Sequence, residues 1–360
     1  MPSALKDLFS AGLVKQLGKS IALNAREFDV KAFEKKVLDK QWKELELKQR
    51  MRKISTTLGE CLDIPYQQQL TVLKKSAKEF NGLFGMVFPD FVEVYGQAHP
   101  DLSLDALEFF TPFSSSEFAI RPFLLHYPEL TLKRMMEWSK SKNYHVRRLA
   151  SEGSRPRLPW AMAIPALKKN PSPVLPILEN LKNDPEDYVY RSVANNLNDI
   201  SKDHPQLVLT LCKKWKGQSK SADWVVKHAL RTLLKKGNQE ALQLFGHHDK
   251  NNVAIESFSL NKKSYSIGEQ MSFHISIKNS DKKKHSFRLE YRMHYVKANG
   301  KTSPKTFLIR KTELSGGESL SISKSQWLKD FSTRKHYSGK HSIELIINGV
   351  IKSKIDFNLK

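Results

Sequence analysis

Cysteine is scarce in this chain, and the cysteines that occur are isolated. Among the 360 residues only Cys61 and Cys212 are cysteines, and neither belongs to a Cys-x-x-Cys pair or a Cys/His cluster. This argues against a disulfide framework and against a zinc site of the usual spacing. The sequence therefore predicts two ordinary thiols in a reducing compartment, which we take to be the cytoplasm.

Long hydrophobic runs and the common catalytic motifs are also missing. The most apolar window, residues 82–96, is interrupted by Pro89, Asp90 and Glu93 and is too short to span a bilayer. The N-terminal segment lacks the continuous apolar stretch of a signal peptide. No His-Glu-x-x-His, phosphate-binding P-loop or Gly-x-Ser-x-Gly motif occurs. We therefore expect no membrane contact, no metal and no organic cofactor.

Negative charge is in short supply along the whole chain. The 60 Lys and Arg residues outweigh 37 Asp and Glu, which gives a net charge of +23. The excess is not confined to a tail, since residues 251–360 hold 21 basic against 9 acidic residues and residues 1–250 hold 39 against 28. Such a distribution favours a polyanionic partner, above all nucleic acid. The alternative is a generally cationic protein without such a partner.

The pattern of apolar and polar residues changes near residue 250. Residues 1–248 show helical periodicity, for example over 28–62 and 66–80. Residues 252–360 alternate apolar and polar residues, which is typical of strands. Turn signals punctuate this part at Ser266-Ile267-Gly268, Asn279-Ser280-Asp281, Asn299-Gly300, Gly316-Gly317 and Asn348-Gly349. The sequence predicts a HEAT-like α-solenoid over 1–248 and an immunoglobulin-like β-sandwich of about seven strands, without the disulfide, over 252–360.

The expected boundary lies at His247-His248-Asp249-Lys250. Two histidines and an aspartate raise the question of a metal site. Neighbouring linker residues rarely converge on one ion without further ligands, so we favour a plain linker.

The helical part contains a repeat. Three eight-residue segments carry small or apolar residues at positions 1, 4, 5 and 8, the stripe of a helix packed against a neighbour. These segments are residues 146–153, 190–197 and 226–233. An upstream helix is expected before each, over residues 129–140, 173–184 and 205–216. Spacings of 44 and 36 residues are typical of stacked HEAT-type helix pairs, and an irregular helical bundle is the alternative.

The second position of each segment is a cation: Arg147, Arg191 and Lys227. Equivalent positions in a solenoid form a row along one surface. A row of cations on a concave face matches the phosphates of a duplex, so we predict that these three residues contact DNA. The alternative is a solvated basic face.

A single acid, Glu152, lies in the arginine-rich stretch RRLASEGSRPRLPWA, residues 147–161. The simplest interpretation is an ion pair with Arg148, four residues earlier on the same helix, worth about 0.3–0.5 kcal/mol. The functional interpretation is that positive charge develops beside Glu152 during a reaction. Cleavage of an N-glycosidic bond creates an oxocarbenium-like sugar, which carboxylates stabilise.

Four further residues of this stretch suit contact with a nucleic acid, and Arg148 is the first of them. We expect Arg155 and Arg157 to hold phosphates on either side of Glu152. Trp160 is suited to pack against a deoxyribose or an exposed base face.

At this point the chain resembles a known family. The resemblance rests on LKDLFS near the N-terminus, SSEFAIRPFLLHYPE (115–129), RRLASEGSRPRLPWA (147–161) and VANNLNDISKDHP (193–205). These segments are similar to DNA alkylation-repair glycosylases of the AlkC type, within the AlkC/AlkD superfamily of HEAT-like proteins. The resemblance covers essentially the whole chain, and ASEGSRPRLPWA is its most specific block. The β-domain resembles the form of the family with an added immunoglobulin-like domain.

The resemblance implies a function and a set of site residues. It implies hydrolytic excision of N3-alkylated adenine, chiefly 3-methyladenine, from double-stranded DNA without flipping the base out of the stack. It implies that Glu152 is the leading catalytic carboxylate, that Glu117 and Asp199 are further acids of the site, and that Trp160 contacts the DNA beside the lesion.

Taken without the resemblance, the further acids have structural interpretations. Glu117 follows Ser114–Ser116 and suits the first turn of a helix, and Arg121 lies four residues later as a candidate ion-pair partner. Asp199 suits a helix end or turn.

Other functions stay open on the residues alone. One is a solenoid that recognises damaged DNA without chemistry, and another is a HEAT scaffold for an acidic protein. No lysine stands out as a nucleophile, so we do not expect strand cutting. In the β-domain, Lys282–Lys284 and residues 332–336 are either DNA-gripping loops or solvated loop tips. We expect a monomer without an obligate protein partner.

Overall fold

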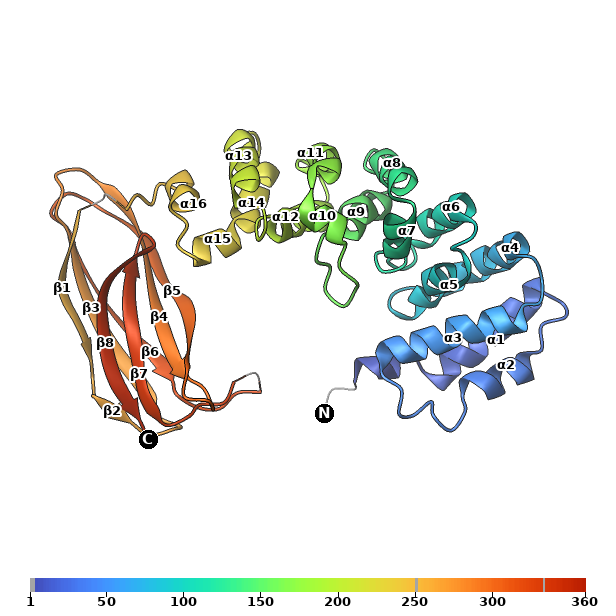
Figure 1. Ribbon diagram of the computed structural model, residues 1–360, viewed down its shortest axis with the longest axis horizontal. Coiled ribbons are helices and arrows are strands. Elements are labelled where there is room, and N and C mark those ends of the chain that lie inside the picture. Colours follow the sequence, from blue (N-terminus) through green and yellow to red (C-terminus); the bar gives the residue numbers. More distant parts are fainter. Residues whose placement is uncertain (1–3, 250–251, 333) are drawn as a thin grey trace. The chain divides into compact units, whose positions relative to one another are not determined.

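The computed structural model describes residues 4–249, 252–332 and 334–360. The chain divides into two compact units (Figure 1). The first comprises the described residues up to Val208 together with Lys214–Ala229. The second comprises Leu209–Lys213 and Leu230–Lys360.

Helices account for the regular structure of the first unit. The α-helices up to the repeat region are α1 (Ala11–Asn24), α2 (Val30–Val37), α3 (Leu47–Cys61), α4 (Tyr66–Ser76), α5 (Val87–Tyr95), α6 (Pro100–Phe110) and α7 (Ile120–His126). They are followed by α8 (Pro128–Trp138), α9 (Tyr144–Gly153), α10 (Pro165–Lys169), α11 (Leu175–Leu181), α12 (Asp187–Ile200), α13 (Pro205–Trp215) and α14 (Lys220–Ala229). Residues 209–213 of α13 are assigned to the second unit. Short 3-10 helices cover Leu5–Leu8, Ala77–Glu79, Phe84–Met86 and Ser172–Val174.

The stretch 28–62, which the periodicity predicts as helical, is two helices. The helix α2 ends at Val37 and α3 begins at Leu47. The new start is set by a capping box, in which the Glu46 side chain accepts from the backbone of Gln49 and the Gln49 side chain accepts from the backbone N–H of Glu46. Local capping therefore overrides the continuous apolar pattern.

The predicted repeat falls on the helices α9, α12 and α14, and α12 packs against both of the others. Eleven of the twelve apolar positions are buried, and Tyr190 is half-buried. One detail of the prediction is wrong: the third segment, 226–233, is not one helix. The helix α14 ends at Ala229 and α15 (Arg231–Lys235) begins beyond a turn at Leu230.

The second unit contains a sandwich of two sheets. The strands are β1 (Val253–Leu260), β2 (Ser264–Tyr265), β3 (Gln270–Asn279), β4 (His285–Val296), β5 (Thr302–Leu314), β6 (Ser319–Trp327), β7 (Gly339–Ile347) and β8 (Val350–Leu359). One sheet has the order β1-β3-β6 and the other β2-β8-β7-β4-β5. Four of the five predicted turn signals lie between strands, and the fifth, Asn279-Ser280-Asp281, begins at the last residue of β3. Within the described part of the domain, the one strand beyond the expected seven is the two-residue β2, which pairs in parallel with β8.

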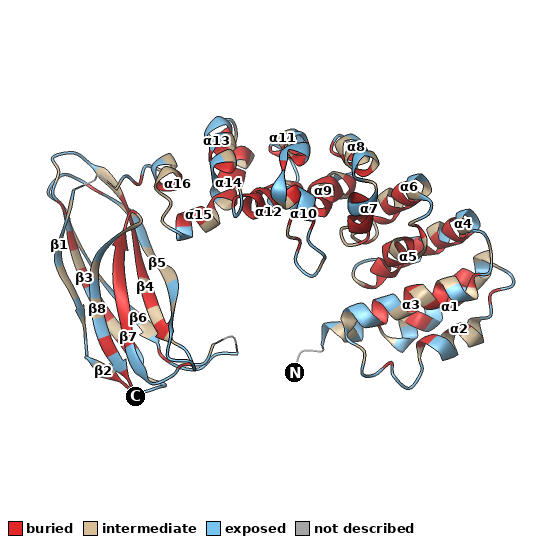
Figure 2. Ribbon diagram, in the orientation of Figure 1, coloured by how far each residue is buried: buried red, intermediate tan, exposed pale blue. Residues whose placement is uncertain are grey.

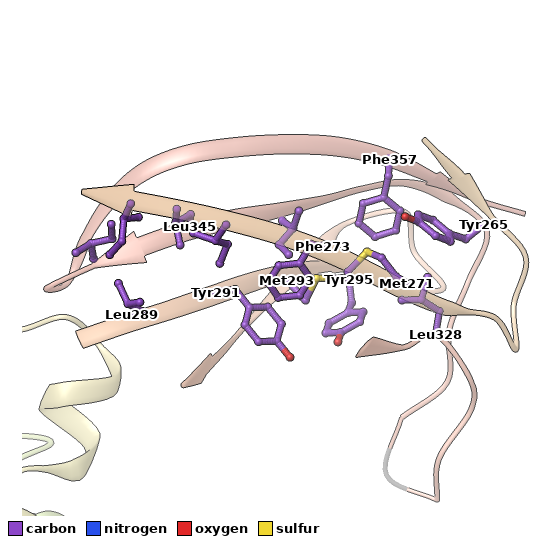
Figure 3. Close-up of a cluster of buried hydrophobic side chains, with 14 of the residues drawn as sticks. Tyr265, Met271, Phe273, Leu289, Tyr291, Met293, Tyr295, Leu328, Leu345 and Phe357 are labelled. Atoms are coloured by element: carbon purple, nitrogen blue, oxygen red, sulfur yellow. The ribbon is translucent and has the colours of Figure 1, made fainter. Parts of the chain in front are cut away.

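Apolar side chains from both sheets meet to form the sandwich core (Figure 3). The rings of Phe273 on β3 and Tyr291 on β4 lie 4.9 Å apart between centroids. The strand β7 is buried along most of its length (Figure 2). Both cysteines lie outside the sandwich and are free, so its two sheets are held by apolar packing rather than by a disulfide.

The change from helix to strand falls between α16 (Gln239–Leu244) and β1. The main segment of the compact unit that holds the sandwich begins earlier than β1, at Leu230, because the region of α15 and α16 packs on the turn between β7 and β8. There Gln239 Nε2 donates to the carbonyl of Asn348 at 3.3 Å, and Gly237 approaches Gly349 closely. The division into residues 1–248 and 252–360 stays a prediction, and Lys250 at its centre lies outside the described residues.

Candidate active-site cleft

Two predicted acids lie together at the ends of neighbouring helices. Glu152 is in the last turn of α9 and Asp199 in the last turn of α12. They are only 5% and 2% exposed, respectively. The helices are joined by polar contacts: Ser151 Oγ donates to Ser192 Oγ at 2.7 Å, and Asn196 Nδ2 donates to the carbonyl of Ser151 at 2.8 Å. Helix packing thus brings together two acids that are 47 positions apart in the sequence.

Arg155 bridges these two acids. Its Nη1 lies 2.7 Å from Glu152 Oε1, and its Nε lies 2.9 Å from Asp199 Oδ2. Lys202 Nζ contacts the other oxygen of Asp199 at 2.9 Å. Burial alone would lower the pKa of Arg155, but the charges of Glu152 and Asp199 outweigh it and raise the pKa above its usual value.

Arg148 connects Glu152 to the third predicted acid, Glu117. Its Nη1 lies 2.6 Å from Glu117 Oε2, and its Nη2 lies 3.6 Å from Glu152 Oε1. The guanidinium also lies 4.3 Å over the ring of Tyr188. The ion pair that the spacing of Arg148 and Glu152 suggests is therefore present, although Arg155 is the nearer partner of Glu152. We call the alternating set Glu117, Arg148, Glu152, Arg155, Asp199 and Lys202 the charge row.

The structural interpretations of Glu117 are wrong. It does not cap a helix, because α7 begins at Ile120 with Ala119 as its N-cap. It does not pair with Arg121 either, since Arg121 donates to backbone carbonyls instead. Glu117 accepts from Ser115 Oγ at 2.7 Å, in addition to its contact with Arg148.

A cavity of about 320 Å³ opens beside the charge row. Its lining includes Glu117, Phe118, Glu152, Arg155 and Trp160. Asp199 is not among the lining residues and reaches the cavity only through Arg155. The cavity therefore presents two carboxylates, each held by an arginine, to whatever occupies it.

Trp160 lies at the tip of the loop of residues 154–164, which we call the Trp160 loop. Its side chain is 68% exposed, and its φ of 63° lies in the left-handed region, which is unusual for a residue with a bulky side chain. Lys48 on α3 donates to the Trp160 carbonyl and lies 4.2 Å over the ring of Phe118. The loop thus presents an exposed indole at the edge of the cavity.

The last residue of α9, Gly153, is required by close packing. A Cβ atom there would lie 2.7 Å from Ile120 Cγ2, so α9 approaches α7 directly at the point where the Trp160 loop begins.

The three predicted phosphate-binding cations of the repeat differ in their exposure and in their contacts with acids. Arg147 is half-buried and forms a two-point ion pair, in which its Nε and Nη2 contact the two carboxylate oxygens of Asp184 at 2.6 and 2.9 Å. Arg191 is exposed and contacts Asp187 at 3.0 Å, and Lys227 is exposed. The register identified these positions, but it carried no information on Asp184, which lies before the next helix.

The two arginines after Glu152 also differ. Arg155, which the sequence suggested as a phosphate contact, is buried within the charge row, where its guanidinium contacts Glu152 and Asp199. Arg157 is half-buried and pairs with Asp203, with Nη2 2.7 Å from Oδ1. Of the two, Arg157 is the one at the surface.

Three aromatic residues escaped the sequence reasoning. Tyr144, Tyr188 and Trp224 each lie two positions before the first position of the repeat and are half-buried or exposed. Tyr188 stacks on Arg148, and Arg191 lies 5.6 Å over the ring of Trp224. Extending the alignment by two residues would have found them.

The basic segments of the β-domain also differ in exposure. Lys282–Lys284 are exposed in the turn between β3 and β4. In the second segment Arg334 stacks on Tyr295 and His336 is buried, while Thr333 lies outside the described residues.

In the described residues no group of three or more His, Cys, Asp or Glu side chains is arranged to hold a metal ion. Within the same residues, no helix has the length and apolar character needed to cross a membrane.

Comparison with known proteins defines the family. Residues 111–233 match the family of DNA alkylation repair enzymes, and residues 254–360 match the C-terminal Ig-like domain of the uncharacterised protein YhaZ. The chain is 45% identical to YhaZ of Bacillus subtilis (strain 168) over 99% of both chains. The alkylpurine DNA glycosylase AlkC of Pseudomonas fluorescens, bound to DNA containing an abasic site analog, matches with a TM-score of 0.93 and 36% identity, over 99% of this chain and all of that one.

The helical region, the Ig-like domain and these matches agree. The chain belongs to the DNA alkylation-repair glycosylases of the AlkC type, in the form with a C-terminal immunoglobulin-like domain. The resemblance drawn from the sequence is confirmed.

Proposed function

We propose that this chain is a monofunctional DNA-3-methyladenine glycosylase. It hydrolyses the N-glycosidic bond of N3-alkylated adenine in duplex DNA and leaves an abasic site. The observation that carries the proposal is a pair of carboxylates, Glu117 and Glu152, lining a cavity whose other charged residues are Lys48 and Arg155. A supporting fact is that the Pseudomonas fluorescens relative was captured on DNA with an abasic site analog, which mimics the product of base removal.

The chemistry of an alkylated base explains why carboxylates suffice. Adenine alkylated at N3 is cationic and leaves readily with the bonding electrons, so the enzyme needs little acid catalysis. The sugar that remains carries positive charge, which Glu152 stabilises through space. A water molecule adds to C1′ and its proton passes to a carboxylate or to solvent. The products are a free base and an abasic sugar.

The arginines of the charge row hold the carboxylates in place. Arg148 holds Glu117 and Glu152, and Arg155 holds Glu152 and Asp199, so the acids keep a fixed orientation before DNA arrives. In this scheme Asp199 acts on the cleft by orienting Arg155. In this proposal the base stays in the stack, and the carboxylates of the cleft act on the sugar.

Groups that are exposed or half-buried at the surface make the DNA contacts. Arg157, Arg191 and Lys227 bind phosphates, and Trp160 packs beside the lesion. Arg147 stabilises this surface through its ion pair with Asp184. In the β-domain, Lys282–Lys284 are the exposed candidates for a grip on the duplex. We propose a monomer that needs no protein partner.

The decisive test is chromatography of the bases that the full chain releases from alkylated genomic DNA. We expect 3-methyladenine in the released fraction and no 7-methylguanine. Release of both bases would leave the glycosylase assignment standing and overturn the selectivity. Release of neither base would favour the alternative, a solenoid that binds damaged DNA without chemistry.

A further inference from the structure

We propose that Arg121 is a positioning residue, which fixes the Trp160 loop and thereby sets where Arg155 and Trp160 lie relative to Glu152. This inference rests on the proposed glycosylase function and adds to it a residue outside the charge row.

Arg121 ties both ends of the Trp160 loop to α7. Its Nη1 donates to the carbonyls of Gly153 and Arg155, both at 2.9 Å. Its Nε donates to the carbonyl of Met162 at 2.6 Å. Gly153 and Arg155 lie where the loop leaves α9, and Met162 lies just beyond Trp160. One side chain therefore holds the entry and the exit of the loop.

The burial of Arg121 indicates that its charged side chain does more than fill space. The residue is 0% exposed, and in the described part of the chain no carboxylate lies within ion-pair distance of it. Burial lowers the pKa of Arg121 to about 10, which still leaves the guanidinium charged at neutral pH. A buried charge without a paired acid is unfavourable, and an apolar residue would fill the same space at less expense in free energy. The structure compensates with the three carbonyls and with the nearby charges of Asp199, Glu152 and Glu117, while Arg121 Nη2 is buried without a hydrogen-bond partner among the described residues.

The loop needs external support because its own conformation is strained. Trp160 has a left-handed backbone, which a bulky residue adopts only where its surroundings impose it. Within the loop, the backbone N–H of Ile164 donates to the carbonyl of Pro156 at 3.2 Å. Lys48 holds the Trp160 carbonyl from the cavity side. Arg121 is the support that reaches both ends from the buried side.

Arg121 affects the proposed reaction through the position of Arg155. Arg121 holds its backbone carbonyl, and its side chain in turn holds Glu152 and Asp199. A shift of the loop would move the bridging guanidinium and the indole together, while α9 would keep Glu152 in place. Misplacement by about 1 Å can lower a rate on the order of 100-fold.

The test compares Arg121 with another buried arginine. Arg50 is also buried, and it also donates to backbone carbonyls, those of Lys6 at 2.9 Å and Leu45 at 3.2 Å, but it does not line the cavity or touch the Trp160 loop. Arg121→Met, Arg121→Lys, Arg50→Met and Arg50→Lys are made in the full chain. For each we would measure the melting temperature, the affinity for a duplex containing 3-methyladenine, and the single-turnover release rate well below the melting temperature.

We expect both methionine variants to melt at lower temperature, and only Arg121→Met to lose rate, by about tenfold or more at saturating enzyme. DNA affinity should change less than the rate, because Arg157, Arg191 and Lys227 remain. Arg121→Lys should recover part of the rate, since an ammonium can still donate to some of the carbonyls. Equal release rates for Arg121→Met and Arg50→Met would overturn the inference.

If Arg121→Met does not fold, Arg121→Lys decides. A folded lysine variant with the full wild-type rate would overturn the inference, because the fork geometry would then be dispensable. Failure of the wild-type chain to release any base would instead refute the proposed function, and the two failures are thus distinguishable.

Discussion

Replacing Glu152 with glutamine is expected to abolish base release while the affinity for duplex DNA stays equal or rises. Glutamine keeps the shape of the side chain and removes the negative charge that repels phosphates. The same change removes the charge that stabilises the sugar cation, and loss of such a group lowers rates on the order of 100- to 1,000-fold or more. Single-turnover release from a 3-methyladenine duplex, with affinity measured by anisotropy, separates the two effects.

The matched control is Glu137→Gln. Glu137 is exposed on α8, so this variant loses the same charge from the chain away from the cavity. It should release base at the wild-type rate. If Glu152→Gln also excised at the wild-type rate, the catalytic assignment of Glu152 would be wrong, whatever the DNA affinity showed.

Replacing Arg155 with methionine is expected to have the largest effect on stability. The change leaves Glu152 and Asp199 buried without their shared cation, and removal of one partner from a buried ion pair costs about 3–5 kcal/mol. Lys202 still contacts Asp199, and Arg148 stays 3.6 Å from Glu152, so we expect the lower end of that range. Base release should be lost as well. Urea unfolding gives the free energy of unfolding.

Arg157→Met provides the internal comparison for Arg155→Met. It removes a cation two positions along the same loop, from a pair with Asp203 that is partly open to solvent. Such pairs contribute about 0–1 kcal/mol, so the stability of this variant should stay near that of the wild type while DNA affinity falls. Equal losses of stability in the two variants would show that the charge row has no special part in holding the cleft.

Much of the fold could be predicted because local patterns and packing agree. Apolar residues at positions 1, 4, 5 and 8 marked α9 and α12, and the Asn-Gly pairs marked the hairpin turns of the sandwich. The errors arose where a local cap or turn interrupts an unbroken apolar pattern. The capping box at Glu46 splits 28–62, and the turn at Leu230 splits 226–233. Periodicity carries no information about such interruptions.

The site could be predicted in its acids and less well in its cations. Glu152 stood out because an acid among arginines is unusual, and the resemblance added Glu117 and Asp199. The directions of Arg147 and Arg155 depend on carboxylates 37 and 44 residues away, which no spacing rule connects. Arg121 lacked any signal, because its partners are backbone carbonyls and every residue has one.

The most direct measurement is a crystal structure of Glu152→Gln bound to a duplex that contains an N3-alkylated adenine analogue. We expect the residue 152 side chain to lie within about 4 Å of the deoxyribose of the damaged nucleotide, with the base still stacked. A complex in which this side chain points away from that sugar, or in which the base occupies the cavity, would contradict this expectation.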